Sequence, residues 1–117
     1  MAEALGGRLS QHYPRLTVTT GSNDPAGFDI VVNATSLGMA EDDPLPMDVA
    51  RIDPATFVGE VVMEQEVTPF LRAVQGKGCR TQVGADMLFE QIPAYLEFFG
   101  FPTTTPDKLR EVARIAY

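Results

Sequence analysis

The residues best suited to chemistry follow an apolar run, residues 30–32, in the segment DIVVNATSLGM. Asn33 offers an amide, and Thr35 and Ser36 offer hydroxyls, directly where such a run would end as a strand. In open α/β sheets, ligands bind beyond the carboxyl ends of the strands. Gly38 then lets the backbone turn sharply. The pattern favours a ligand-binding turn, and the plainer alternative is an ordinary strand end with a capped turn.

Two further motifs follow this turn along the chain, TPFL at 68–71 and GADMLFEQ at 84–91. In the order NATSxGM, TPxL and GxxMLxxQ, the sequence resembles the C-terminal part of the shikimate dehydrogenase family. The resemblance runs from about Ala2 to the C-terminus. It implies a nicotinamide-cofactor domain that binds NADP or NAD, with the choice undecided. It also implies that the full-length enzyme acts on a cyclic hydroxy acid such as shikimate or quinate.

The resemblance assigns binding roles to individual positions. The residues that it implies for cofactor binding are Asn33, Ala34, Thr35, Ser36, Val61, Gly84 and Met87. The residues that it implies for substrate binding are Met63 and Gln91. Outside the motif, Met87 would be read as core filling and Gln91 as a partly exposed helix residue. No catalytic residue and no metal ligand is assigned.

The sequence departs from the family pattern in the strand before TPxL. Glu60 replaces an aspartate, and Met63 stands where a tyrosine would meet the substrate. A thioether in place of a hydroxyl makes the substrate pocket less polar there, so quinate or an amino analogue stays open beside shikimate. The lysine and aspartate pair that serves proton transfer in the family has no counterpart here. His12, Lys77 and Lys108 lie outside the motifs, and we expect them to be solvated surface residues.

Composition limits the classes of partner. The chain has 117 residues, and 9 Lys and Arg against 16 Asp and Glu give a net charge of -7. This charge disfavours nucleic-acid binding, which requires a positive surface. One cysteine, Cys79, allows no intramolecular disulfide, and no apolar run reaches the roughly 20 residues that span a membrane. We therefore expect a cytoplasmic protein.

The acidic segment around residues 41–48 invites a metal hypothesis. Hard cations need several oxygens that converge from a shaped site. Proline at 44 and 46 instead predicts an irregular loop. We expect this loop to be solvated.

The secondary-structure pattern predicts one α/β domain over residues 1–117. A helix is expected over 2–12, and further helices begin after Thr68, near Gly84 and after Thr105, where N-cap and proline signals occur. Short strands are expected at 16–20, 28–32, 57–63 and 79–83. Strands that alternate with helices indicate a mostly parallel sheet. The expected fold is therefore a partial Rossmann-like three-layer domain with about four strands and C-terminal helices.

In the Rossmann strand order 3-2-1-4-5-6, the predicted strands would be the third to the sixth. The first two strands and the Gly-rich phosphate loop have no counterpart in this sequence. Residues 28–32 would then present an open apolar edge, which is a template for association. We expect residues 16–20 to move onto this edge, or two copies to self-associate through it.

Two functions remain open from the sequence. In the first, the chain is the C-terminal cofactor-domain portion of a shikimate dehydrogenase-like oxidoreductase, inactive alone, with the N-terminal substrate domain absent. In the second, it is a non-catalytic remnant or interaction module that assembles through its open sheet edge. A glutamyl-tRNA reductase relative is a weaker third option, because GxxMLxxQ argues against it. Whether the chain itself is an enzyme is left uncertain.

Overall fold

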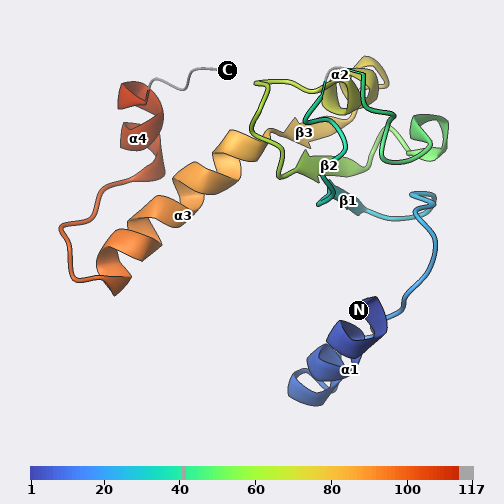
Figure 1. Ribbon diagram of the computed structural model, residues 1–117, viewed down its shortest axis with the longest axis horizontal. Helices are drawn as coiled ribbons and strands as arrows, with labels where there is room; N and C mark the ends of the chain where they lie inside the picture. Colours follow the sequence, from blue (N-terminus) through green and yellow to red (C-terminus); the bar gives the residue numbers. More distant parts are fainter. Residues whose placement is uncertain (41, 114–117) are drawn as a thin grey trace.

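The structure is a computed structural model that describes residues 1–40 and 42–113 (Figure 1). The elements run in the order α1 (Ala2–His12), β1 (Ile30–Asn33), the 3-10 helix η1 (Val49–Arg51), β2 (Phe57–Glu60), α2 (Pro69–Gly76), β3 (Arg80–Gln82), α3 (Gly84–Phe98) and α4 (Pro106–Val112). Alternating strands and helices confirm the predicted α/β fold. No helix in the described ranges is long and apolar enough to cross a membrane.

The three strands form one parallel sheet in the order β1-β2-β3. Asn33 pairs with Glu60, and Gly59 pairs with Gln82, so the carboxyl ends of all three strands lie at the same edge. α2 connects β2 to β3 and packs on one face of the sheet. This arrangement confirms the parallel Rossmann-like sheet, although each strand is shorter than predicted.

The strand predicted at residues 16–20 does not form, so the sheet has three strands among the described residues and not about four. The segment is irregular, and Leu16 is exposed. A single extended segment gains no ladder hydrogen bonds without a neighbour, and residues 16–20 do not pair with β1. The expected move of this segment onto the open edge is therefore wrong. β1 keeps exposed Ile30 and Val32 on one face.

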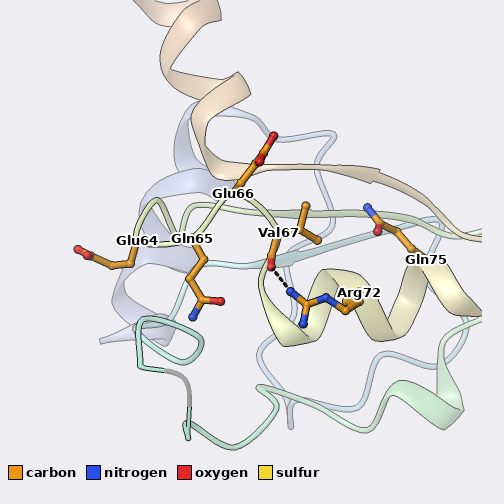
Figure 2. A pocket seen from close by; sticks show the side chains of 6 residues that line it. All are labelled: Glu64, Gln65, Glu66, Val67, Arg72 and Gln75. Atoms are coloured by element: carbon orange, nitrogen blue, oxygen red, sulfur yellow. Dashed lines mark hydrogen bonds between the residues drawn. The ribbon is translucent and has the colours of Figure 1, made fainter. Parts of the chain in front are cut away.

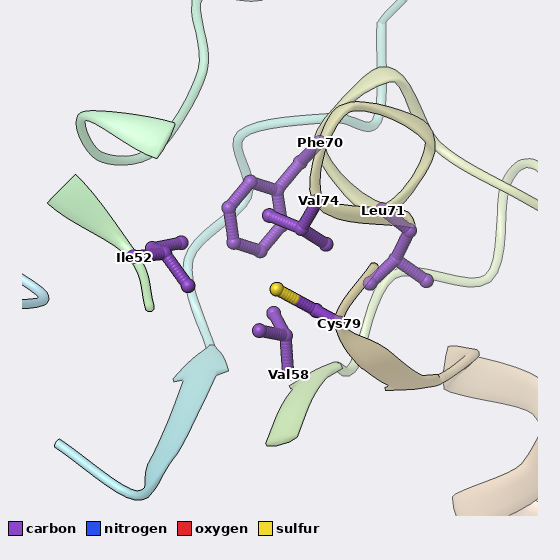
Figure 3. Close-up of a cluster of buried hydrophobic side chains, with 6 residues drawn as sticks. All are labelled: Ile52, Val58, Phe70, Leu71, Val74 and Cys79. Carbon is purple, nitrogen blue, oxygen red and sulfur yellow. The ribbon is translucent and has the colours of Figure 1, made fainter. Parts of the chain in front are cut away.

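The hydrophobic core lies between α2 and the sheet (Figure 3). Phe70, Leu71 and Val74 project from α2 onto Val58 of β2. The core residues are Ile52, Val58, Phe70, Leu71, Val74 and Cys79. Burial of Cys79 leaves its thiol within a packed core. The core therefore fixes α2, and with it the segment that enters α2, against the strands.

Lys77 corrects the prediction of a solvated surface lysine. Its ammonium group donates to three backbone carbonyls, those of Val49, Ala50 and Ile52, at 2.8, 2.9 and 2.6 Å. These carbonyls lie in and after η1, where a short helix leaves acceptors unpaired. Lys77 therefore joins the end of α2 to η1 and has a structural role.

α3 and α4 form a hairpin that extends away from the sheet (Figure 1). Thr105 caps α4 as predicted, because its hydroxyl accepts from the Lys108 backbone N–H at 3.2 Å. Arg110 of α4 bonds Asp86 and Glu90 of α3 and lies over the Phe89 ring. The prediction that the last helix carries Ala116 lies outside the described residues.

Candidate functional site

The predicted cofactor residues gather at the carboxyl edge of the sheet. Asn33 ends β1, and its carbonyl accepts from the backbone N–H of Val61 at 3.2 Å. Ala34, Thr35 and Ser36 are exposed in the turn that follows, while Asn33 is only 1% exposed. The turn therefore begins at a buried residue, Asn33, and its next three residues face solvent.

The Asn33 side chain holds this turn, which we call the NATSLG turn (residues 33–38). Its Oδ1 accepts from the Thr35 backbone N–H at 3.1 Å and from the Thr35 hydroxyl at 2.7 Å. Its Nδ2 donates to the Leu37 carbonyl at 2.9 Å. The Thr35 hydroxyl oxygen in turn accepts from the Leu37 N–H at 3.1 Å. Asn33 thus organises the turn through its side chain.

The acidic loop supports the other end of the NATSLG turn. Gly38 has φ +101°, which favours glycine, and its N–H donates to Asp43 Oδ2 at 2.9 Å. The Ala40 N–H donates to the same oxygen at 3.0 Å. These backbone hydrogen bonds, from Ala40 first and then from Gly38, lower the pKa of Asp43. Within residues 1–40 and 42–113, no three His, Cys, Asp or Glu converge as metal ligands.

Gly84 brings the start of α3 against the segment after β2. A Cβ built at Gly84 would overlap the backbone carbonyl of Val62, so only glycine fits. Val83 precedes the helix without a side-chain cap. The first N–H groups of a helix have no intrahelical partner and favour negative or polar ligand groups. Asn33, Val61 and Gly84 are therefore brought together through backbone contacts, with the first turn of α3 beside them.

The remaining predicted residues lie on segments that lead away from this edge. Met87 is half-buried in the first turn of α3, and Met63 is 48% exposed after β2. Gln91 is exposed one turn further along α3, where its Oε1 accepts from the Tyr95 hydroxyl at 3.0 Å. Its amide NH₂ donates to no partner within the described residues. No hydrogen bond within the described part of the chain joins these three side chains, and their assignment to substrate and cofactor stays a prediction.

A hollow of about 580 Å³ beside α2 is not lined by any predicted site residue (Figure 2). Its lining residues are Glu64, Gln65, Glu66, Val67, Arg72 and Gln75. Arg72 donates to the Val67 carbonyl at 3.1 Å, which occupies its guanidinium on one side. Two carboxylates with one arginine disfavour a phosphate-bearing ligand. We therefore place the candidate site at the carboxyl edge of the sheet.

Three residues behind the edge were missed as contributors to the site. Thr68 caps α2, because its hydroxyl oxygen accepts from the Leu71 N–H at 3.2 Å, and the same hydroxyl donates to Glu60 at 2.9 Å. Asp43 holds Gly38 as described above. An acid within the apolar run FVGEVV was a signal for Glu60, since a charge there requires an explanation. Nothing in the sequence marked Asp43 among its acidic neighbours.

Curated relatives match nearly the whole chain. A shikimate dehydrogenase (NADP⁺) from Jannaschia sp. is 39% identical over 116 residues, which are 95% of this chain and 39% of that protein. A shikimate dehydrogenase (NADP⁺) from Rhodospirillum rubrum is 32% identical over 114 residues, which are 93% of this chain and 40% of that protein. No family model matches the chain.

Solved structures share the arrangement of the elements. Quinate dehydrogenase from Corynebacterium glutamicum, in complex with NAD, superposes with a TM-score of 0.79 at 29% identity, over 94% of this chain and 41% of that one. A 5-ketofructose reductase of Gluconobacter sp. shares the fold with a TM-score of 0.77 at 24% identity, over 94% of this chain and 42% of that one. The chain spans about two fifths of the length of these relatives. It therefore belongs to the shikimate dehydrogenase family.

Proposed function

We propose that this chain forms the nicotinamide half of an NAD(P)-binding domain in an oxidoreductase that acts on a cyclic hydroxy acid such as shikimate or quinate. The observation that supports this most is the NATSLG turn, which a buried Asn33 holds beside the start of α3. The relatives named as shikimate and quinate dehydrogenases support the substrate class. We propose that residues 1–117 form a single domain, which is a portion of that cofactor domain.

The geometry fits a nicotinamide nucleotide by its chemistry. The exposed Thr35 and Ser36 hydroxyls can bond a ribose, and the backbone at Ala34 and Val61 can bond a carboxamide. Gly84 leaves the start of α3 open to close approach, and Met87 can pack on an aromatic ring. When bound, the cofactor would supply or accept the hydride. The proposal covers both NADP and NAD, because no lysine or arginine occurs between residues 28 and 50 to select a phosphate.

Substrate contact is proposed for Gln91 and Met63. The Gln91 NH₂ can donate to a hydroxyl or carboxylate while Tyr95 holds its carbonyl. Met63 would present an apolar surface to the ring of the hydroxy acid. No residue of this chain is proposed for proton transfer, so catalysis requires groups that the chain does not contain. We expect no turnover by the chain alone.

Binding of cofactor fragments tests the proposal. Isothermal titration of the chain with reduced nicotinamide mononucleotide should give measurable binding, because the proposed site contacts the nicotinamide and its ribose. Adenosine monophosphate, titrated in parallel, should give none. Equal binding of both nucleotides, or binding of neither, would contradict a site for the nicotinamide half.

A second candidate function is assembly through the open edge of β1. Ile30 is 64% exposed and Val32 is 52% exposed, and no strand of the described residues lies beside one backbone edge of β1. Unpaired apolar edges recruit further strands. Self-association of two copies is the form of assembly that we propose. Sedimentation at the mass of one chain at every concentration would contradict it.

A further inference from the structure

Glu60 is a buried acid behind the candidate site. It ends β2, is 3% exposed, and lies opposite Asn33 in the parallel register. Paired residues of neighbouring strands place their side chains on the same face of the sheet. Glu60 and Asn33 therefore point together toward the side that α2 covers. A carboxyl group at this position must be either paired or neutral, because burial of a lone charge is costly.

The contacts of Glu60 tie two segments together. Its Oε2 accepts from the Thr68 hydroxyl at 2.9 Å, and the Thr68 oxygen accepts from the Leu71 N–H that begins α2. Thr68 also meets Gly38, since a Cβ at Gly38 would lie 3.7 Å from the Thr68 Cβ. Glu60 thus reaches the start of α2 directly and the end of the NATSLG turn through Thr68.

Among residues 1–40 and 42–113, the second carboxyl oxygen has no hydrogen-bond partner. Glu60 Oε1 is buried without a hydrogen bond. A neutral carboxylic acid fits this asymmetry, with the proton on Oε1 and the Thr68 hydrogen bond on Oε2. An ionised carboxylate would leave a charged oxygen unsolvated, which costs more than an unpaired neutral group.

We propose that Glu60 is a positioning residue, which as a neutral acid holds the start of α2 and the NATSLG turn in the geometry that frames the nicotinamide site. The inference rests on the function proposed above. Glu60 lies behind the turn and touches no ligand. It acts through Thr68, at the start of α2, and Asn33, in the NATSLG turn. Ionisation of Glu60 would draw water toward Oε1 and weaken the packing of both segments.

The electrostatic surroundings agree with this role. Burial raises the pKa of Glu60, and the hydrogen bond from the Thr68 hydroxyl and the neighbouring Asn33 side chain oppose this only in part. The charged groups on the flanking segments are Asp43, bonded to Gly38 N, Arg72, bonded to the Val67 carbonyl, and the exposed Glu64 and Glu66. None of them contributes to the shift.

The sign of the linkage follows from the raised pKa. The stability that Glu60 contributes is fully present below pH 4.5, the ordinary value for the group, and is lost as pH rises through the folded-state pKa. Glu60→Gln cannot ionise, so it should not show this loss. The Asp43 contribution has the opposite sign, because its pKa is lowered from 3.8. The stability that Asp43 contributes is lost below pH 3.8, outside the pH range in which the Glu60 contribution is lost.

Carbon and amide NMR titration of the full chain tests the proposal. We expect the Glu60 side-chain carboxyl carbon to titrate above pH 4.5. The amide signals of Leu71 and Thr35 should shift with the same midpoint, because Thr68 bonds both Glu60 and the Leu71 N–H, and Asn33, which bonds the Thr35 N–H, lies opposite Glu60 in the strand register. In Glu60→Gln, both amide shifts should be absent. Glu64→Gln, an exposed neighbour in sequence, should leave all three titrations unchanged.

Two outcomes would overturn the inference. A titration midpoint of Glu60 at or below pH 4.5 would mean a solvated carboxylate. Leu71 and Thr35 amide signals that do not shift with the Glu60 carboxyl carbon would mean that Glu60 positions neither segment.

Affinity for reduced nicotinamide mononucleotide should fall with rising pH in the wild type and stay level in Glu60→Gln. Absence of nucleotide binding at every pH would instead count against the proposed function, while the NMR titration would still decide the role of Glu60.

Discussion

Gly84→Ala is expected to lower the free energy of unfolding by about 3 kcal/mol, the upper range for overpacking at a rigid position. The added Cβ would overlap the Val62 carbonyl, which belongs to the backbone and cannot move as a side chain can. Relief requires the start of α3 to shift from the segment after β2. Urea denaturation, followed by circular dichroism, measures the change.

Gly76→Ala is the matched control for this substitution. Gly76 ends α2, and a Cβ there meets nothing within 4 Å. Alanine in a helix costs less backbone entropy than glycine, so the control should be neutral or slightly stabilising. Equal stability of the Gly84 and Gly76 variants would contradict the close approach of α3 to Val62.

Asn33→Ala is expected to cost about 3 kcal/mol, since three hydrogen bonds of about 1 kcal/mol each are lost. These are the bonds to the Thr35 N–H, the Thr35 hydroxyl and the Leu37 carbonyl. The NATSLG turn should open, and binding of reduced nicotinamide mononucleotide should be lost with it. Urea denaturation gives the stability change, and calorimetric titration gives the binding.

Asn23→Ala provides the comparison for Asn33. Asn23 is exposed, and its amide makes one hydrogen bond, to the Pro46 carbonyl at 2.9 Å. The cost there should be about 1 kcal/mol or less, with nucleotide binding retained. If Asn33→Ala bound the nucleotide as well as Asn23→Ala does, the NATSLG turn would not be part of the site.

Local signals in the sequence predicted much of the fold. Thr68 before Pro69 and Thr105 before Pro106 predicted two helix starts, and both hydroxyls accept the expected backbone N–H. Such caps depend on residues only three apart, so sequence alone is sufficient. The polar turn after β1 was predicted for the same reason, because the hydrogen bonds of the Asn33 side chain to Thr35 and Leu37 lie within the turn.

Features that depend on distant partners were not predictable in this way. Residues 16–20 alternate like a strand but form none, because a strand requires a neighbour that no local pattern supplies. Lys77 bonds carbonyls more than 20 residues earlier. Gly84 was assigned to cofactor approach by resemblance, whereas the structure adds an internal reason, the Val62 carbonyl. Each case is decided by residues that are distant in the sequence.

Amide NMR mapping of reduced nicotinamide mononucleotide on this chain tests the central claim most directly. The account predicts that shifts concentrate at residues 34–36, at Val61 and at residues 84–87, where the NATSLG turn and the start of α3 meet. Shifts confined to the hollow beside α2, or no shifts at millimolar nucleotide, would contradict a nicotinamide site at the carboxyl edge of the sheet.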